Sequence, residues 1–299
     1  MKVVKSIEEI NPAKPCAVAL GNFDGVHLGH MRVIHEAVNA DGLLPAVFTF
    51  QGNPHGSPAI MLPEDKERVI ADTGADLLIS IGFDTVQKLP ADEFFYSILL
   101  EKCRAKKLCC GDDFRFGINA SGDVMLLQQL CRENNVELKI IPTVKIDGQR
   151  ISSTAIRKAL ELGDVKTAND MLGRPFGFSL EVVQGNRIGR NLGAPTINQT
   201  LPKGFVLPKF GVYASLAYVG DTKYYGVTNI GVKPTVGSNH VLSETWMPEF
   251  SGDLYGKKIY IAILGFIRAE RKFDSLDSLK KEILINARQA REIVFSHRL

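Results

Sequence analysis

The sequence predicts two domains of different class, an α/β domain followed by a small antiparallel β-barrel or sandwich with a C-terminal helix. In the first part of the chain, buried apolar runs alternate with helix-like stretches, which is typical of a parallel sheet covered by helices on both faces. After Gly173 the chain turns to short alternating strands with turn-rich connections, which favours a barrel or sandwich. We therefore expect domains at 1–172 and 173–299, each long enough to bury its own core.

The individual elements follow from these patterns. In the first domain the predicted strands are 16–20, 45–50, 76–83, 106–111 and 136–144, and the predicted helices are 30–40, 62–74, 91–105 and 124–135. Segment 91–105 is expected to be an amphipathic helix. In the second domain the predicted strands are 178–185, 211–220, 223–231, 242–250 and 257–267, followed by a helix over 275–295.

Composition excludes several functional classes. Lys and Arg total 36 against 33 Asp and Glu, so the chain lacks the basic footprint of a nucleic-acid binder. We expect no signal peptide and no membrane-spanning helix, because the sequence shows neither an N-terminal apolar segment with a cleavage site nor an apolar run of about 18 residues. The five cysteines form no C-x-x-C pair, so reduced thiols in a cytoplasmic protein are the simplest interpretation.

A glycine-rich turn, GNFDGVHLGH, joins the first strand to the first helix. Glycines at 21, 25 and 29 allow close approach of the backbone to phosphates, and the N–H groups at the helix start favour an anion. His27 and His30 are three residues apart and can face one ligand, where they can stabilise charge at a phosphorus centre. The alternative is a tight turn with two incidental histidines. The strand-turn-helix context favours the nucleotide site.

Two further segments of the first domain fit such a site. In ISSTAIRKAL, the hydroxyls of Ser152, Ser153 and Thr154 precede a helix, and Arg157 lies one turn in. Hydroxyls at this position cap helices but also suit phosphate, as does a guanidinium. In GDDFRFG, Asp113 can accept a ligand hydrogen bond and the two phenylalanines can flank a flat ring. That segment alone is a weak signal, because paired phenylalanines are usually core.

The second domain contains GNRIGRNLGAPTIN. Its glycines can form a flap over a nucleotide, although no G-K-[ST] ends the segment as in a P-loop. Thr196 and Asn198 are two residues apart on an extended chain, so their oxygens can reach one cation, and oxygen ligands suit Mg²⁺. An ordinary Asn/Thr turn is the alternative.

Together these motifs resemble bacterial bifunctional riboflavin kinase/FAD synthetases. GNFDGVHLGH, GDDFRFG and ISSTAIRKALELGDVKTANDMLGRP occur in that family's order, and the resemblance implies a Rossmann-like nucleotidylyltransferase domain that moves AMP from ATP onto FMN and releases pyrophosphate. It implies flavin contacts from Asp113 and Phe114. It also implies ATP or phosphate contacts from Gly21, Phe23, Gly25, His27, His30, Ser153, Thr154 and Arg157. In this chain no basic residue follows the last glycine of GDDFRFG, where the family often has one.

The remaining motifs resemble a flavokinase domain. GRNLGAPTIN, PKFGVYA, GVTNIGVKPTVG and FSGDLYGKKIYIAILGFIRAERKF occur in the expected order. The resemblance implies an enzyme that phosphorylates riboflavin with Mg²⁺–ATP, with Glu244 as the catalytic base. It implies nucleotide contacts from Gly185, Gly189 and Thr196, and Mg²⁺ contacts from Thr196 and Asn198. The expected partners are riboflavin, FMN and ATP, with no nucleic acid and no membrane.

Two alternatives remain at this point. One is a nucleotidylyltransferase for another substrate, such as a pantetheine or nicotinate compound, because the H-x-G-H and I-S-S-T motifs are widely shared. The barrel motifs of the second domain argue against it. The other is a flavin-binding or regulatory protein in which one site has lost activity. The presence of the expected site residues argues against such a loss; these are His27, His30, Thr196, Asn198 and Glu244.

Overall fold

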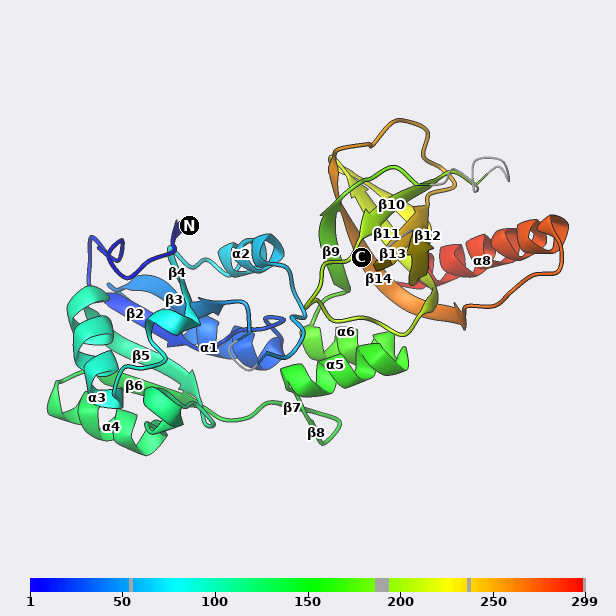
Figure 1. Ribbon diagram of the computed structural model, residues 1–299. Coiled ribbons are helices and arrows are strands. Elements are labelled where there is room, and N and C mark those ends of the chain that lie inside the picture. Colours follow the sequence, from blue (N-terminus) through cyan, green and yellow to red (C-terminus); the bar gives the residue numbers. More distant parts are fainter. Residues whose placement is uncertain (54–55, 186–193, 236–237, 298–299) are drawn as a thin grey trace. The chain divides into compact units, whose positions relative to one another are not determined.

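The computed structural model describes residues 1–53, 56–185, 194–235 and 238–297, without the side chains of 233–235 and 238–239. Contacts within the chain define two units, Met1–Ala59 with Pro63–Ser153, and Ile60–Leu62 with Thr154–Leu299. Figure 1 shows an α/β unit and a β-rich unit. Each unit is a separate body with its own sheet.

The first unit is built on a six-stranded sheet in which every pairing is parallel. The strand order is β1-β4-β3-β2-β5-β6. The chain moves from β2 to β3 and β4 on one side, and returns to place β5 and β6 on the other side. The carboxyl ends of β2 and β5 therefore form the switch point of a doubly wound sheet, where such folds bind ligands. The strands are β1 (Lys2–Val4), β2 (Cys16–Leu20), β3 (Leu44–Gln51), β4 (Leu77–Gly82), β5 (Ala105–Gly111) and β6 (Glu137–Ile141).

Helices α1 (Leu28–Val38), α2 (Pro63–Ala71) and α4 (Val124–Glu133) connect these strands, as the alternating pattern predicts. The segment after β4 differs from the prediction. Only Ala91–Glu93 (α3) is α-helical, and Phe94–Lys102 continues as a π-helix. This segment buries side chains around much of its circumference, where an amphipathic helix would bury a single apolar stripe. The buried residues are Phe94, Phe95, Ile98 and Leu99. A hairpin of β7 (Lys145–Ile146) and β8 (Gln149–Arg150) follows β6.

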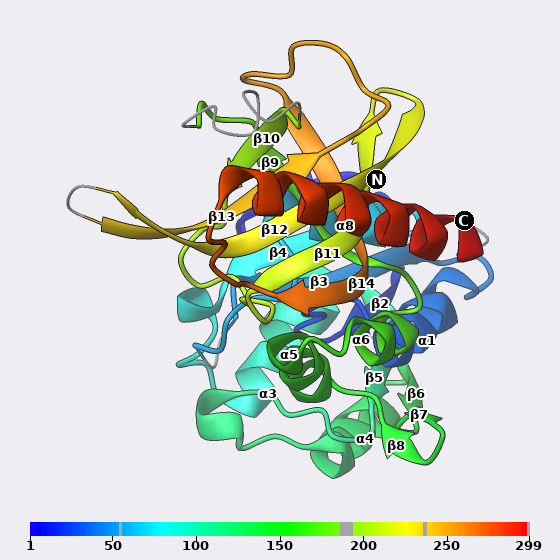
Figure 2. The same cartoon turned by 90° about the vertical axis from the view of Figure 1, so that its right-hand side faces the viewer.

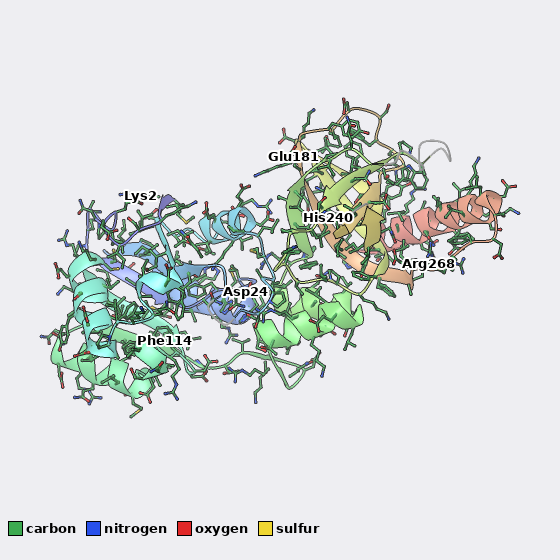
Figure 3. All side chains as sticks on the ribbon, in the orientation of Figure 1. Lys2, Asp24, Phe114, Glu181, His240 and Arg268 are labelled. Carbon is green, nitrogen blue, oxygen red and sulfur yellow. The ribbon has the colours of Figure 1, made fainter. Side chains whose placement is uncertain are left out.

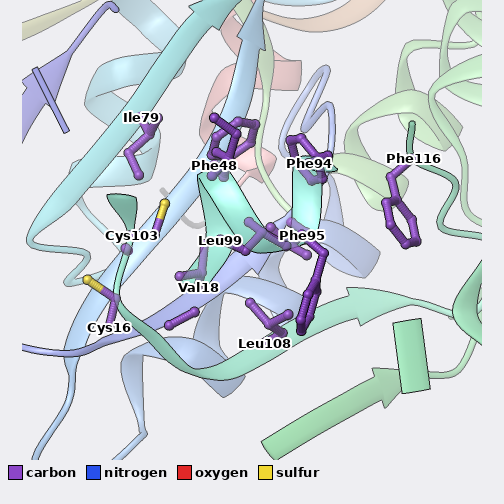
Figure 4. Packing of buried hydrophobic residues seen from close by; sticks show 14 of the residues in the cluster. Cys16, Val18, Phe48, Ile79, Phe94, Phe95, Leu99, Cys103, Leu108 and Phe116 are labelled. Atoms are coloured by element: carbon purple, nitrogen blue, oxygen red, sulfur yellow. The ribbon is translucent and has the colours of Figure 1, made fainter. Parts of the chain in front are cut away.

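The core of the first unit lies between this π-helix and the sheet. Figure 4 shows Phe95 and Leu99 packed near Val18 and Leu108, and all four side chains are less than 2% exposed. Cys16 and Cys103 belong to the same core. All five cysteines are buried free thiols, and burial raises the pKa of each, to about 11 for Cys16. These thiols stay protonated and act as small apolar side chains.

The second unit is an antiparallel sheet in the order β10-β13-β12-β11-β14-β9. Its strands are β9 (Phe176–Glu181), β10 (Thr196–Thr200), β11 (Gly211–Val219), β12 (Thr222–Thr235), β13 (Ser238–Trp246) and β14 (Lys258–Ala269). The C-terminal helix α8 (Leu276–Ser296) lies over β11, β12 and β14 (Figure 2), where Val294 packs on Leu216, Ala262 and Leu264.

Helices α5 (Ser153–Leu162) and α6 (Val165–Leu172) precede the barrel. The helix α6 ends at Gly173, which has a φ of +70° and suits the left-handed C-terminal position. The Asn169 amide donates to the Ile263 carbonyl (3.0 Å), and its Oδ1 accepts from Phe176 N (2.7 Å). These bonds attach α6 to β9 and β14, so residues 154–172 pack with the second unit.

The two edge strands, β10 and β9, meet and close the barrel. Val183 N donates to the Asn198 carbonyl (2.8 Å) just beyond β9. The fully buried Gln199 amide, on β10, donates to the carbonyls of Leu180 (2.6 Å) and Ile259 (2.8 Å). Closure removes exposed sheet edges, and here one side chain joins three strands.

Replacing Gln199 should therefore weaken the second unit. We expect Gln199→Leu to lower the free energy of unfolding by roughly 1–3 kcal/mol for each carbonyl left buried without a donor. Urea unfolding followed by circular dichroism measures this loss. Gln128→Leu, at an exposed position of α4, is the control and should change stability by less than about 0.5 kcal/mol. Equal stability of the two variants would show that the Gln199 bonds do not hold the barrel closed.

Candidate active sites

A cavity of about 710 Å³ lies at the carboxyl ends of the strands of the first unit. Its lining includes Leu20 and Gly21 after β2, Gly111 after β5 and Ile141 after β6. This is the switch point of the sheet, where the strand order predicts a ligand. All of the lining residues belong to the first unit.

The GNFDG turn forms one wall of the cavity and has an unusual backbone. Phe23, Gly25 and Val26 have φ values of +49°, +79° and +39°. Positive φ is rare for phenylalanine and strained for the β-branched Val26, and such strain concentrates at functional sites. Gly21 allows the turn to fold tightly, because a Cβ there would lie 3.0 Å from the Phe23 ring. Phe23 itself is 1% exposed, so it shapes the turn from within.

His27 and His30 lie together at the start of α1, as predicted. The helix begins at Leu28, two residues earlier than expected, because His27 is its N-cap and accepts a hydrogen bond at Nδ1 from His30 N (3.2 Å). The two rings stack with centroids 3.5 Å apart, and the Phe23 ring meets His30 edge-on at 5.3 Å. Since Nδ1 of His27 accepts, its neutral ring carries the proton on Nε2. Both histidines line the cavity.

Phenylalanines form a large part of the cavity wall. Phe48, Phe50, Phe83, Phe94, Phe114 and Phe116 all line the cavity. Phe114 (labelled in Figure 3) and Phe116 stack on each other, with centroids 5.7 Å apart and an interplanar angle of 13°. A flat ligand between the two rings would have to separate them, so their contact with such a ligand stays a prediction. A flat ligand can meet this wall from the cavity side.

Asp113 lies in this wall, and the structure adds a partner that sequence analysis missed. Arg150, on β8, forms an ion pair with the Asp113 carboxylate and also lines the cavity. The sequence contains a signal for the hairpin that carries Arg150. Asp147-Gly148 is a typical hairpin turn dipeptide, and both residues have positive φ. The hairpin supplies a basic side chain to a wall whose own motif has none after Gly117.

The ISST segment reaches the same region through Ser153. Its Oγ donates to the Asp24 carbonyl (2.9 Å) in the glycine-rich turn, and Ser152 and Ser153 line the cavity. The two motifs thus lie side by side, as predicted. Thr154 and Arg157 lie on α5 in the second unit, and their phosphate contacts stay a prediction.

In the second unit, Asn198 and Glu244 are direct partners on neighbouring strands β10 and β13. Thr196 precedes Asn198 by two residues and shares its face of the strand. Asn198 is 5% exposed, and its Oδ1 is a buried acceptor without a hydrogen-bond partner among the described residues. Its Nδ2 lies 3.4 Å from the Thr196 carbonyl. Glu244 is half-buried. The structure therefore groups the three predicted kinase residues.

The glycine segment lies against this group at Gly185, where a Cβ would approach the Asn198 side chain to 2.5 Å. Gly189 lies outside the described residues. The strand expected over 242–250 ends at Trp246, so Glu249 lies in a turn and is exposed. Pro248 lacks the N–H that a continued strand needs. The strand predicted over 242–250 is therefore too long at its C-terminal end.

Within the described residues, no group of three or more His, Cys, Asp and Glu side chains has a metal-binding arrangement. A cation site at Thr196 and Asn198, as the sequence predicts, would have neutral protein oxygens as its ligands. No helix in the described parts of the chain has both the length and the apolar character needed to cross a bilayer.

Fold and sites together define a two-domain transferase, with a nucleotidylyltransferase-type α/β unit and a flavokinase-type barrel. Family models match as FAD synthetase over residues 9–155 and as riboflavin kinase over residues 172–294. The chain belongs to the family of bifunctional riboflavin kinase/FMN adenylyltransferases. Members from Escherichia coli K12 and Haemophilus influenzae are 36% identical to it, with 98% and 95% of this chain and 97% and 96% of those proteins aligned.

A further family member, from Pseudomonas fluorescens, is 32% identical over 98% of both chains. A crystal structure described as a macrolide-efflux protein from Streptococcus pneumoniae has the same fold, with a TM-score of 0.86 and 30% identity over 97% of this chain and 98% of that one. That description belongs to the other protein. The present chain is an enzyme of flavin cofactor synthesis, with riboflavin kinase and FMN adenylyltransferase activities.

Proposed function

We propose that adenylylation takes place in the cavity of the first unit, with ATP and FMN as substrates. The observation that carries this proposal is the stacked His27–His30 pair, which lies at the switch point of the sheet in a cavity that phenylalanines also line. An FMN phosphate oxygen attacks the α-phosphorus of ATP, the bond to the bridging oxygen breaks, and pyrophosphate leaves. The N–H groups of the turn and the two imidazoles stabilise the charge that develops on the phosphates.

The other predicted residues have roles on either side of this centre. We assign phosphate contacts to the turn at Gly21, Phe23 and Gly25, and to Ser153, which already contacts the Asp24 carbonyl. Thr154 and Arg157 complete this set by family resemblance. Asp113 and Phe114 contact the flavin, whose flat ring suits the cavity-facing side of the aromatic wall. Arg150 holds the Asp113 carboxylate in place.

Riboflavin phosphorylation is assigned to the β10–β13 face of the second unit. Glu244 takes the proton of the riboflavin 5′-hydroxyl as that oxygen attacks the γ-phosphorus of ATP. Asn198 lies directly opposite Glu244 on the neighbouring strand, so the base and the nucleotide-binding residues adjoin. Gly185, packed against Asn198, and Gly189 would cover the nucleotide.

Magnesium fits this second site. Asn198 Oδ1 is a buried oxygen with no partner among the described residues, and hard cations such as Mg²⁺ bind oxygen ligands together with substrate phosphates. Thr196 and Asn198 would hold the ion, which neutralises charge on the transferred phosphoryl group. The protein residues position the nucleotide beside Glu244.

Metal removal tests this assignment. We expect chelation of divalent cations to stop riboflavin phosphorylation, and added Mg²⁺ to restore it. Asn198→Ala should raise the Mg²⁺ concentration needed for half-maximal kinase activity by at least roughly tenfold, since losing even a supporting partner of a metal ligand costs that much. FAD formation from supplied FMN is the internal control. An unchanged Mg²⁺ requirement in this variant would remove Asn198 from the metal site.

We also propose 172/173 as the boundary between the two activities and the cytoplasm as the location. The riboflavin kinase model begins at residue 172, although residues 154–172 pack with the second unit. The five free thiols fit a reducing compartment.

One assay tests the whole scheme. Purified protein is supplied with Mg²⁺–ATP and either riboflavin or FMN, and the flavins are separated by chromatography. We expect FMN and FAD from riboflavin, and FAD with equimolar pyrophosphate from FMN. FAD formation without pyrophosphate would contradict the proposed chemistry.

A further inference from the structure

Lys66, on α2, reaches the glycine-rich turn from outside the cavity. Its Nζ donates to the Asn22 carbonyl (2.7 Å), to Thr49 Oγ1 (2.7 Å) and to the Phe50 carbonyl (3.3 Å). An ammonium group has three N–H donors, and all three are used here. The acceptors lie in the turn after β2 and on β3, so one side chain joins α2 to both.

The Asn22 carbonyl is the critical acceptor. It also accepts from Thr49 Oγ1 (2.8 Å), so two donors fix the peptide that immediately precedes Phe23. The turn then adopts positive φ at Phe23, Gly25 and Val26. Strained backbone of this kind persists only when its surroundings hold it firmly. Lys66 provides part of that support.

Among the described residues, the Lys66 Nζ contacts neutral acceptors, and no carboxylate lies within ion-pair distance of it. Asp24, in the turn, is the acidic residue whose charge interacts with the Lys66 ammonium group. On α2 itself, Asp65 binds Arg68 (3.1 Å) and Glu67 binds Lys5 (3.3 Å).

Burial lowers the pKa of Lys66 to about 8, and Asp24 partly opposes that shift. Asn22 and Phe50, which supply two of the three acceptors, line the cavity. A buried cation whose hydrogen-bond acceptors are neutral keeps its positive potential, which can attract a nearby anion. Its contacts and its charge therefore both act on the proposed phosphate site.

We propose that Lys66 is a positioning residue for FMN adenylylation, which holds the Asn22 carbonyl and thereby the phosphate-binding turn, and adds positive potential to the site. This inference rests on the proposed phosphate role of the turn. It also specifies a direction for the effect of pH. Deprotonation removes one donor and the charge, so adenylylation should decline as pH rises through about 8.

The test uses the full chain with Lys66→Met, Lys66→Arg and Thr49→Val, which removes only the bridging hydroxyl. Lys5→Met is the control, because Lys5 contacts the same helix from the solvent side. FAD formation from FMN and ATP, FMN formation from riboflavin, and the thermal unfolding temperature are measured on each preparation.

We expect Lys66→Met to lower kcat/KM for ATP in adenylylation by roughly 10- to 100-fold, as for a lost charged hydrogen bond. Riboflavin phosphorylation should stay within about twofold of wild type, which shows that the variant is folded, and the thermal unfolding temperature records the stability lost with the three hydrogen bonds. Lys66→Arg should recover most of the loss. It should also move the alkaline decline upward, because a guanidinium stays protonated. Thr49→Val should give a smaller loss, and Lys5→Met none.

His30→Ala, assayed in parallel, separates the possible failures. If His30→Ala loses FAD formation and Lys66→Met does not, the inference on Lys66 is wrong and the proposed site stands. If neither variant loses activity, the phosphate role of the turn fails, and the inference with it. If Lys66→Met loses activity but Lys66→Arg neither restores it nor shifts the pH profile, the role of Lys66 is structural and the inference is overturned.

Discussion

Glu244→Gln should reduce riboflavin phosphorylation by roughly 10²- to 10⁴-fold, the usual contribution of a positioned general base. The substitution keeps the shape of the side chain and removes its basicity, while Thr196 and Asn198 on the neighbouring strand are unchanged. We therefore expect ATP still to bind. The measurement is FMN formation from riboflavin under saturating Mg²⁺–ATP, together with nucleotide affinity by calorimetry.

Two controls accompany this variant. FAD formation from supplied FMN should be unchanged in Glu244→Gln, because that reaction is assigned to the other unit. Glu249→Gln alters an exposed carboxylate in the turn beyond β13 and should leave phosphorylation within about twofold. A full-rate Glu244→Gln enzyme with an inactive Glu249→Gln enzyme would transfer the role of base to Glu249.

His30→Ala should lower FAD formation from FMN by on the order of 10²- to 10³-fold, as for loss of one donor to developing charge. The His30 ring stacks on His27 with centroids 3.5 Å apart, and both imidazoles line the cavity. The pair can therefore present two ring N–H donors to the phosphates of one nucleotide. The backbone N–H that binds His27 Nδ1 remains in the variant, so the N-cap of α1 is retained.

His35→Ala is the matched control for His30→Ala, since His35 lies on the exposed side of the same helix and should leave both activities near normal. His27→Ala should also impair adenylylation, and it additionally removes the side-chain cap of α1. If FAD formation were unchanged in both His27→Ala and His30→Ala, the histidines would have no part in phosphate chemistry.

The sequence predicts the layers of the fold well, because strand and helix periodicities are local. Cys16–Leu20 is apolar throughout and is the fully buried strand β2, and the shift of pattern at Gly173 coincides with the end of α6. The π-helix at Phe94–Lys102 was not predicted, because a dense apolar run satisfies several helical periods. The end of β13 at Trp246 was not predicted either, although Pro248, which lacks an N–H, indicates that the strand ends before it.

Sequence motifs predicted part of the candidate sites, and the remaining residues are brought there by tertiary contacts. His27 and His30 are close in sequence, and local geometry places them together. The pairing of Asn198 with Glu244 depends on strand register between residues 46 positions apart, which no local pattern specifies. Arg150 and Lys66 reach the site from a hairpin and a helix that contain none of the recognised motifs. Their contributions depend on long side chains that cross between elements.

The seam of the barrel, where β9 and β10 meet at Val183 and Asn198, has a consequence for engineering. The main chain of Asn198 closes the sheet through Val183, its side chain belongs to the kinase site, and Gly185 packs on that side chain without room for a Cβ. Structural integrity and chemistry thus depend on the same few atoms. Directed evolution of the kinase should find few tolerated changes along this seam. Thermostabilising substitutions are better sought on the exposed face of α8, where a gain in stability can be selected without altering turnover.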